Sequence, residues 1–419
     1  MSKILSLVCL LAILTGCAND KKGNKETSEV STDRMHFIAK RFKNTLKDDP
    51  NPKKLPRTIK KDGSLRTVGP YDWTSGFFPG NMWYMYELTK DTLWKNEAVK
   101  RTVLLDTIQY WEDNHDVGFM INCSYGNGLR FGNKKEYEDV VIQAAKSLST
   151  RFNEKAQVLK SWQWTRSWDS IVLNYPVIID NMMNLELLFE ATKLSGDSIY
   201  GDIAIKHANT TIKNHYRNDY SSYHVVNYDT ITGQVLNRKT SQGYTDESSW
   251  ARGQAWGLYG FTLCYRYTKD DTYLKQAENI ANFIITNPNL PEDMVPYWDY
   301  NAKDPNFKPD WKPKFNPADY PETPRDASAA AITASALLEL SLYSEKKETL
   351  LKAAYKIMES LSSPTYMVKD SKNKYFILDH SVGSIPHGSE IDVPLVYADY
   401  YFLEAIYRKQ KIDKNESFL

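Results

Sequence analysis

Apolar positions recur along most of the chain at the spacing of amphipathic helices, and these helices come in pairs. Four pairs are joined at short polar turns, around residues 89–91, 195–197, 269–271 and 344–346. In each pair the first helix is apolar on most of its faces, whereas the second carries one apolar stripe and many charges. This asymmetry predicts an inner helix that is buried on both sides and an outer helix that faces water.

Further helices are expected near 32–46, 118–129, 136–152 and 393–409, which brings the total to about twelve. Six inner and six outer helices close into a double ring, so the sequence predicts an all-α (α/α)6 barrel. An open superhelical array of hairpins is the alternative. Its end repeats would be polar caps, which are not evident here.

Two stretches interrupt the helical pattern. Residues 221–247 alternate between apolar and polar positions around a turn at "TITG", which predicts a β-hairpin. Residues 286–325 hold nine of the eighteen prolines and predict a long ordered loop. Because loops of that length in a compact domain usually serve a binding site, we expect both stretches near the mouth of a central cavity.

The N-terminus has the build of an export signal. Lys3 precedes an apolar run over 4–14, which is too short to span a bilayer. The following "LTGC" resembles the bacterial lipobox, which would make Cys17 the lipidated first residue. A plain secretory signal with an incidental cysteine is the alternative.

This N-terminal pattern predicts three parts of the chain. They are a lipoprotein signal peptide at 1–16, a polar lipidated tether at 17–31 and a catalytic domain at 32–412. The protein would then be lipid-anchored in a bacterial envelope, at the outer membrane or cell surface, with the periplasmic face also open. The lipid would be its contact with the membrane.

Composition narrows the classes of function. The chain has 419 residues, 42% of them apolar and 25% charged, and a net charge of +1, so nothing in it favours nucleic acid. Aromatic residues reach 13%, which suits either a large aromatic core or a carbohydrate cleft where rings stack on sugar faces. Beyond Cys17 only Cys123 and Cys264 remain in the mature body, too few for a disulfide framework or a zinc cluster, so we expect buried thiols.

The segment "IIDNMMNLELLFEATK" places an aspartate, Asp180, in an apolar helix, with Asn184 one turn later. A carboxylate buried without a partner is costly, so its presence calls for a reason. On an inner helix of a barrel, one stripe faces the central cavity, where partial desolvation would raise the pKa of Asp180 toward that of a general acid. Helix capping behind Pro176 is the weaker alternative.

A second carboxylate, Asp116, lies in "DNHDVGFMINCSYG", after His115 and at the start of another apolar helix. A plain N-cap is its alternative role. Two acids that project into one aromatic-lined cavity are the usual equipment for glycosidic bond chemistry.

Polar groups also stand at the start of a third inner helix. Arg252, Trp256 and Tyr259 fall on one helical face, where a guanidinium beside an indole suits an anionic sugar. A structural Arg–Trp stack is the alternative. His224, in the predicted hairpin, would by itself be a strand histidine with no role.

At these residues the chain resembles the unsaturated glucuronyl hydrolases, glycoside hydrolase family eighty-eight. The matching segments keep the family's order over nearly the whole mature chain. They are "DWTSGFFPGNMWYMYELT", "HDVGF", "IIDNMMNL", "SSYHVVNYD", "TSQGYTDESSWARGQAWGLYGF", "RDASAAAITASALLEL" and "ADYYFLEAI".

The resemblance implies an (α/α)6 barrel with no metal or organic cofactor. It implies substrates that polysaccharide lyases release, oligosaccharides ending in a 4,5-unsaturated glucuronic acid, with or without sulfate. The enzyme would remove that sugar by hydrating the C4=C5 vinyl ether, with Asp180 as acid/base and Asp116 as the second essential carboxylate. The family's substrate contacts fall on Trp73, Trp168, His224, Thr240, Gln242, Arg252 and Trp256.

Arg238 departs from the family's pattern, because some relatives carry a small residue there. It could meet a sulfate on the next sugar or be a solvated loop residue. The segment "DHSVGSIPHGSEIDVP" has no motif that decides sulfate preference, so a glycosaminoglycan and an algal polymer such as ulvan both stay open. A glycan-binding lipoprotein and an unsaturated rhamnogalacturonyl hydrolase on the same barrel are the competing functions.

Overall fold

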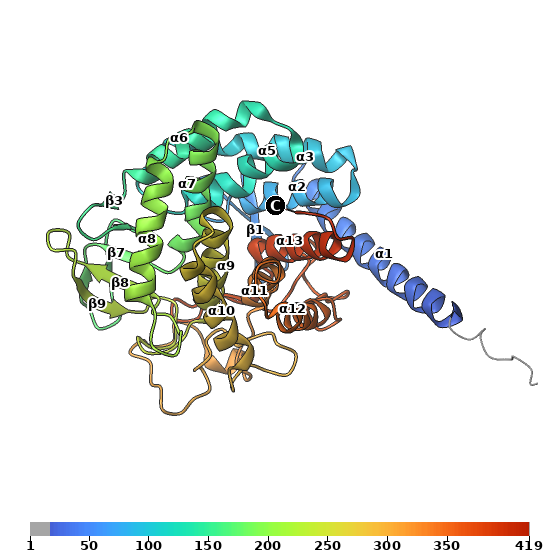
Figure 1. Ribbon diagram of the computed structural model, residues 1–419. Helices are drawn as coiled ribbons and strands as arrows, with labels where there is room; N and C mark the ends of the chain where they lie inside the picture. Colours follow the sequence, from blue (N-terminus) through green and yellow to red (C-terminus); the bar gives the residue numbers. More distant parts are fainter. Residues whose placement is uncertain (1–16, 419) are drawn as a thin grey trace, which may run out of the picture.

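The computed structural model describes residues 17–418, with side chains from residue 32 onward, and its core is a closed ring of inner helices (Figure 1). The predicted signal peptide, 1–16, lies outside the described residues. Six helical segments form the ring: α2 (Phe77–Thr89), the interrupted α4 (Val117–Ile121) and α5 (Asn127–Gly132), α7 (Asn181–Ser195), α9 (Ala251–Thr268), α11 (Ala327–Leu340) and α13 (Val396–Asp413). Each packs on the next, and α13 packs back on α2, so the ring closes and the open array is excluded.

A second layer of helices surrounds this ring. Its members are α1 (Cys17–Asp48), α3 (Thr92–Thr102), α6 (Glu138–Ser149), α8 (Ile199–His215), α10 (Asp271–Thr286) and α12 (Lys347–Leu361). Each of α3, α8, α10 and α12 lies on the inner helix that precedes it, and α6 lies on α4 and α7. On α1, Phe42 packs edge-on against Phe78 and Trp94. The predicted double ring of inner and outer helices is therefore confirmed.

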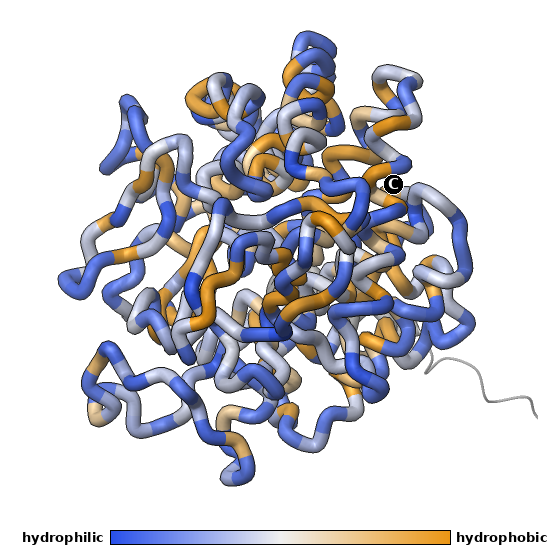
Figure 2. The backbone as a smooth tube through the Cα atoms, turned by 90° about the vertical axis from the view of Figure 1, so that its left-hand side faces the viewer, coloured by the Kyte–Doolittle hydropathy of each residue, from blue (hydrophilic) through white to orange (hydrophobic). Residues whose placement is uncertain are grey.

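Side-chain composition explains the two layers. The inner helix α11 is buried along its whole length, and its alanines and serines let α9 and α13 approach closely. The outer helix α12 buries one stripe, built around Leu350, Ile357 and Leu361. Figure 2 shows the same division, with apolar stretches inside and polar stretches at the periphery.

The predicted turns between paired helices are confirmed, and their chemistry accounts for them. Asp91 and Asp270 cap α3 and α10, each accepting a hydrogen bond from the backbone N–H two residues later. Gly196 ends α7 in the left-handed region, at φ +75°, where glycine is favoured.

The helix expected over 118–129 is interrupted. Between α4 and α5 the chain forms a π turn, η2 (Asn122–Gly126), in which Asn122 donates a hydrogen bond of 2.8 Å to Glu186 on α7. The π turn leaves Gly126 against Asn122, where a Cβ would lie 2.6 Å from the side-chain oxygen. Periodicity alone cannot foresee this turn, because Glu186 is distant in sequence.

The N-terminal helix is longer than expected. It begins at Cys17, so residues 17–31 are helical in the structure. Their role as a tether stays a prediction. None of the described helices combines the length and apolar character needed to cross a membrane.

Short antiparallel strands lie in the segments that connect the helices at one end of the barrel. Within 221–247, β8 (Val225–Tyr228) pairs with β9 (Val235–Lys239), and a strand that the sequence did not predict, β7 (Pro176–Ile178), pairs with the other edge of β8. The two-stranded sheets are β1 (Leu55–Ile59) with β2 (Leu65–Val68), β3 (Phe152–Asn153) with β4 (Val158–Leu159), β5 (Thr165–Arg166) with β6 (Val172–Leu173), and β10 (Ser381–Ser384) with β11 (Ser389–Val393). Because β7 ends two residues before Asp180, this sheet determines where that acid lies.

The segment 286–325 contains one short 3-10 turn, η4 (Pro317–Asp319), and is otherwise irregular. It is tied to the barrel through backbone hydrogen bonds, from Ala251 to Trp298 and from Asp326 to Pro296. The two remaining cysteines, Cys123 and Cys264, are buried free thiols, as expected.

Candidate active site

The inner helices run parallel, so their N-terminal ends meet at one end of the barrel. Contacts between neighbouring helices establish this direction. At the starts of α9 and α11, Arg252 contacts Asp326. Trp73, just before α2, contacts Tyr397 at the start of α13. Asp116 and Asp180 stand at the starts of α4 and α7. The fold therefore brings both predicted acids to one end.

Asp180 occupies the N-cap position of α7 rather than the helix interior that the sequence suggested. The correction has a physical cause, because the apolar residues before it belong to β7. Its side chain nevertheless makes no capping hydrogen bond, and only 8% of the residue is exposed. The carboxylate is therefore available for a role other than capping.

Asp116 repeats this arrangement at α4. It occupies the N-cap, makes no side-chain capping bond and is 9% exposed. Behind it, Gly118 packs against Asn184, and a Cβ there would lie 2.4 Å from the Asn184 Oδ1. The glycine thus lets α4 approach α7 closely enough to bring the two acids together.

Burial governs the protonation of both acids. Burial raises the pKa of Asp180 to about 7, although the Arg252 charge and the Trp256 indole oppose the rise. Burial also raises the pKa of Asp116 well above its ordinary value, and the charges of Asp180 and Asp72 raise it further. Helix N-termini favour ionised carboxylates, so desolvation outweighs the helix dipoles here.

His224, which the sequence alone discounted, lies directly beside Asp180. It precedes β8, and its Nδ1 accepts hydrogen bonds of 3.1 Å from the backbone N–H groups of Ser241 and Gln242. Its Nε2 is 3.9 Å from Asp180 Oδ2. The sheet formed by β7, β8 and β9 therefore carries both the acid and this imidazole.

Arg252 is buried, with 1% of the residue exposed, and its guanidinium is engaged by protein groups. One Nη atom lies 3.0 Å from Asp326, and the two Nη atoms donate to the carbonyl oxygens of Val382 and Gly383. Its ring partner is Trp250, at 4.6 Å, rather than the predicted Trp256. Arg252 thus fastens β10 to the starts of α9 and α11, and its contact with substrate stays a prediction.

A row of aromatic rings runs beside the acids. Trp73 lies 4.9 Å from Tyr397 and 5.8 Å from Phe119, and Phe119 lies 5.1 Å from Trp256. Tyr397, Phe119 and Trp256 are buried and pack on one another, which fits the aromatic core that composition allowed, and the carbohydrate cleft stays a prediction.

Three further predicted residues connect the loops around the acids. The Thr240 hydroxyl accepts a hydrogen bond from the Gly243 N–H, the Gln242 side chain donates to Gly383 O, and the Trp168 indole donates to Ser241 O. Through Ser241 and His224, Trp168 is linked to the environment of Asp180.

Arg238 does not join this group. It pairs with Val226 across the hairpin, donates to the Asn214 backbone and lies over Tyr223, at 5.3 Å. Together with Arg217 it lines a separate shallow pocket of about 520 Å³.

Four neighbours of the site were missed at the sequence level. Asp326 and Tyr397 stand at the starts of α11 and α13, and His115 and Asn181 flank the two acids. His115 and Asn181 left a signal, because the first precedes Asp116 in "HDVGF" and the second follows Asp180 in "IIDNMMNL". Across residues 32–418, no cluster of three or more His, Cys, Asp or Glu side chains is arranged to hold a metal ion.

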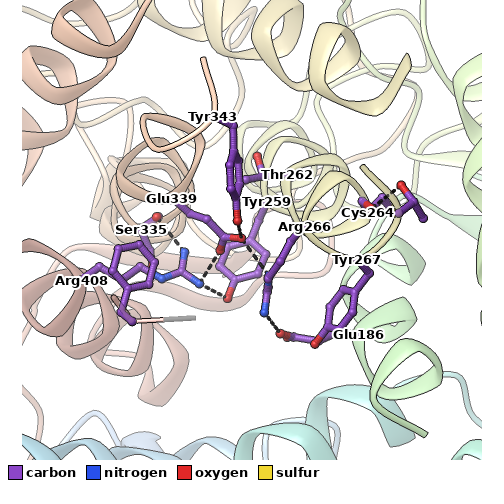
Figure 3. A network of polar contacts seen from close by, with 12 residues as sticks. Glu186, Tyr259, Thr262, Cys264, Arg266, Tyr267, Ser335, Glu339, Tyr343 and Arg408 are labelled. Carbon is purple, nitrogen blue, oxygen red and sulfur yellow. Dashed lines mark hydrogen bonds and ion pairs between the residues drawn. The ribbon is translucent and has the colours of Figure 1, made fainter. Parts of the chain in front are cut away.

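The opposite end of the barrel holds a charged network instead of free acids (Figure 3). Arg266 on α9 and Arg408 on α13 both lie within 3.0 Å of Glu339 on α11, and Arg266 also pairs with Glu186 on α7. Along α9, Arg252 and Arg266 are fourteen residues apart, roughly 21 Å at the helical rise. The two ends of the barrel are therefore chemically distinct.

Known proteins resemble the chain along nearly its full length, although no protein-family model matches it. A protein of Formosa agariphila named unsaturated glucuronyl hydrolase is 44% identical over 418 residues, covering 98% of this chain and 99% of that protein. A solved unsaturated glucuronyl hydrolase specific for heparin is 45% identical with a TM-score of 0.81, covering 91% and 98% of the two chains. A mutant enzyme of the same name from Streptococcus agalactiae, complexed with dGlcA-GalNAc6S, is 29% identical with a TM-score of 0.72, covering 92% of each chain.

Proposed function

Because the chain belongs to the family of unsaturated glucuronyl hydrolases and is a glycosidase, we propose that it acts on oligosaccharides released by polysaccharide lyases. It removes the 4,5-unsaturated glucuronic acid from their non-reducing end. The names of the heparin-specific neighbour and of the dGlcA-GalNAc6S complex support a glycosaminoglycan-type substrate, with or without sulfate.

The observation that carries the mechanism is the state of Asp180. A buried carboxyl with a pKa of about 7 can both give and take a proton near neutral pH. Asp180 protonates C4 of the vinyl ether, which leaves a cation at C5 stabilised by the ring oxygen. Water then adds at C5 and returns its proton to Asp180. The resulting hemiketal opens, and its rearrangement expels the neighbouring sugar.

Asp116 is the second essential acid. Its buried position and strongly raised pKa support a neutral carboxyl that contacts the sugar without adding a second negative charge. This matters because the substrate itself carries a carboxylate, and like charges in a buried site are costly.

The surrounding loops complete the substrate site. His224 and Thr240 flank the β8–β9 hairpin, and Trp168 and Gln242 lie beside them. Trp256 lies against Phe119. We place the hairpin and the 286–325 loop at the mouth of the cavity, because Trp298 in that loop accepts a hydrogen bond from Ala251 at the start of α9.

The test is a panel of lyase-generated disaccharides, sulfated at different positions, followed by loss of the double-bond absorbance. A saturated glucuronide is the matched control, because it has no vinyl ether to protonate. We expect turnover of the unsaturated sugars alone. Binding without turnover would favour a glycan-binding lipoprotein. Turnover of unsaturated rhamnogalacturonides alone would favour an unsaturated rhamnogalacturonyl hydrolase.

We also propose that Cys17 carries the lipid that anchors the enzyme in the bacterial envelope. The "LTGC" sequence after a short apolar run supports this. Labelling with a radioactive fatty acid should mark the wild-type protein, and Cys17→Ser should lose the label and leave the membrane fraction. An unlabelled wild type would point to a plain secretory signal.

A further inference from the structure

The imidazole of His115 lies buried between Asp116 and two asparagines of α7, Asn181 and Asn184. Its Nδ1 is 2.8 Å from Asn181 Oδ1, and its Nε2 is 3.3 Å from Asp116 Oδ1. Burial lowers the pKa of His115 to about 3, so the ring is neutral and carries one hydrogen. Which nitrogen holds that hydrogen decides what the ring can offer Asp116.

Asn181 determines the answer. Its side-chain N–H groups donate to Leu159 O at 2.8 Å and to Ser161 Oγ at 3.1 Å. A carbonyl oxygen can only accept, so the amide nitrogen must face Leu159 and the amide oxygen must face His115. A lone pair on Nδ1 would then oppose another lone pair at 2.8 Å. The hydrogen of His115 therefore resides on Nδ1.

Asn184 does not change this assignment. Its Oδ1 accepts the Phe119 N–H at 2.9 Å, which leaves its amide nitrogen 3.2 Å from His115 Nδ1. That contact is longer than the 2.8 Å contact to Asn181 Oδ1, so the Asn181 oxygen, an acceptor, determines that Nδ1 carries the hydrogen. The Asn184 amide also hydrogen-bonds to Asp116, where it lowers that residue's pKa.

The consequence falls on Asp116. With the hydrogen on Nδ1, Nε2 keeps its lone pair and is buried without a hydrogen-bond partner among the described residues. It lies 3.3 Å from Asp116 Oδ1, where its negative partial charge opposes ionisation of that carboxyl. A neutral Asp116 still offers an acceptor to the Asn184 amide and places no negative charge beside the His115 lone pair. The other charged groups that face it are Asp180 and Asp72, which oppose ionisation, and Arg151, which favours it.

His224 has the opposite tautomer. Two backbone N–H groups donate to its Nδ1, so its hydrogen must lie on Nε2, which faces Asp180 Oδ2 at 3.9 Å. At this distance the two atoms are not hydrogen-bonded, and the positive end of the Nε2–H dipole near the carboxyl favours its ionised form electrostatically.

We propose that the two histidines, in opposite tautomers, hold the acid pair in unequal protonation states, with His115 retaining a proton on Asp116 and His224 favouring the carboxylate of Asp180. The inference rests on the proposed function for its catalytic meaning. His115 and Asn181 are positioning residues: they keep Asp116 neutral, so that Asp180 gains and loses its proton without a second charge beside it.

The direct test is nitrogen NMR of the full-length enzyme labelled with ¹⁵N-histidine, at pH 7 and without substrate. The chain has seven histidines, and His115→Asn and His224→Asn identify two of them. We expect His115 to be protonated at Nδ1 alone and His224 at Nε2 alone. An imidazolium or an Nε2–H form at His115 would overturn the proposal. If His115→Asn does not fold, Asp116→Asn identifies the ring by the shift of its Nε2 signal.

Kinetics give a second test, with a matched control. In His115→Asn the alkaline limb of kcat/KM should move up by about one pH unit, because an ionised Asp116 would hold the proton more tightly on Asp180. His36→Asn alters an exposed histidine on α1, far from the contacts of Asn181, and should leave the limb in place. An unmoved limb in both variants would refute the positioning role. Since the NMR needs no turnover, it separates this inference from the proposed function.

Discussion

The two ends of the barrel bury carboxylates in opposite ways. At the N-terminal end, Asp116 and Asp180 have only the neutral rings of His115 and His224 as ion-pair candidates within 4.0 Å, among residues 32–418. At the C-terminal end, Glu186 and Glu339 pair with Arg266 and Arg408 (Figure 3). Glu404 also pairs with Arg408, at 3.4 Å.

The pKa directions follow from these partners. Burial alone would raise the pKa of Glu339, but the charges of Arg266 and Arg408 outweigh burial and lower it. Asp180 is equally buried and keeps a raised pKa, because the Arg252 charge only partly offsets burial. Helix C-termini also favour the cations gathered at the far end.

The comparison teaches that burial by itself does not define an active site. A buried carboxylate that is paired with a cation links neighbouring helices. A buried carboxylate without such a partner has a perturbed pKa, which suits an acid catalyst, and it lowers the stability of the fold. In this barrel all six inner segments contribute to the far network, which includes Tyr84, Ser335 and Glu404 and, from the interrupted segment, Asn122.

The largest effect should come from Asp180→Asn at the N-terminal end. The amide is nearly isosteric but cannot transfer the proton, so kcat should fall by about 10²–10⁴-fold with the fold intact. Turnover of an unsaturated disaccharide and the circular dichroism spectrum measure both parts. Asp270→Asn, which alters an exposed helix cap, should keep its activity. Near wild-type turnover in a folded Asp180→Asn protein would remove the assignment.

The next largest effect is a loss of stability, expected for Glu339→Gln at the C-terminal end of the barrel. Glu339→Gln leaves Arg266 and Arg408 without a shared anion, so the free energy of unfolding should fall by about 3–5 kcal/mol. Denaturant unfolding at pH 7 measures this, with the exposed Glu348→Gln as control. Because the Glu339 pKa is lowered, its contribution to stability should fade as pH drops through its folded pKa. A change below 1 kcal/mol would contradict the idea that this network braces the barrel.

Asp180→Asn should have the opposite effect on stability. A carboxyl whose pKa rises to about 7 binds a proton in the folded state that the unfolded chain releases near pH 4. Stability therefore falls as pH rises from about 4 to about 7, and removing the acid should restore up to about 4 kcal/mol at pH 7 and little at pH 4. Melting temperatures of both proteins across this range test it. A variant destabilised at every pH would mean that Asp180 is structurally paired.

A smaller effect is expected for Arg252→Lys. Lysine keeps a charge near Asp326 but cannot donate to Val382 O and Gly383 O at once, so stability should fall by about 1–3 kcal/mol. If Arg252 also binds the sugar carboxylate, KM should rise as well. Unfolding and kinetics on the same preparation separate the two, and an unchanged stability would show that its contacts to β10 are not important.

The architecture was predictable because periodicity is a local property. The asymmetry between inner and outer helices and the capping residues Asp91 and Asp270 carried it. The placement of Asp180 was not predictable in the same way. β7 is an apolar run that reads as the start of a helix, and its strand pairing with β8 depends on residues almost fifty positions away.

The same limit explains the partners of the site residues. Asp116 and Asp180 could be selected because a carboxylate stands out in an apolar segment. The partners of Arg252 could not, since Asp326 and Gly383 lie 74 and 131 residues away. The tautomer of His115 depends on an asparagine 66 residues away.

The most direct measurement is turnover of an unsaturated disaccharide in heavy water, with early samples analysed for the position of the label. Protonation of the vinyl ether by Asp180 should place one deuterium at C4 of the released uronate, above the exchange seen when unlabelled product stands in heavy water for the same time. Asp180→Asn should abolish that incorporation. Release of the sugar with no C4 label beyond exchange, together with comparable hydrolysis of a saturated glucuronide, would mean that the two acids form an ordinary glycosidase pair.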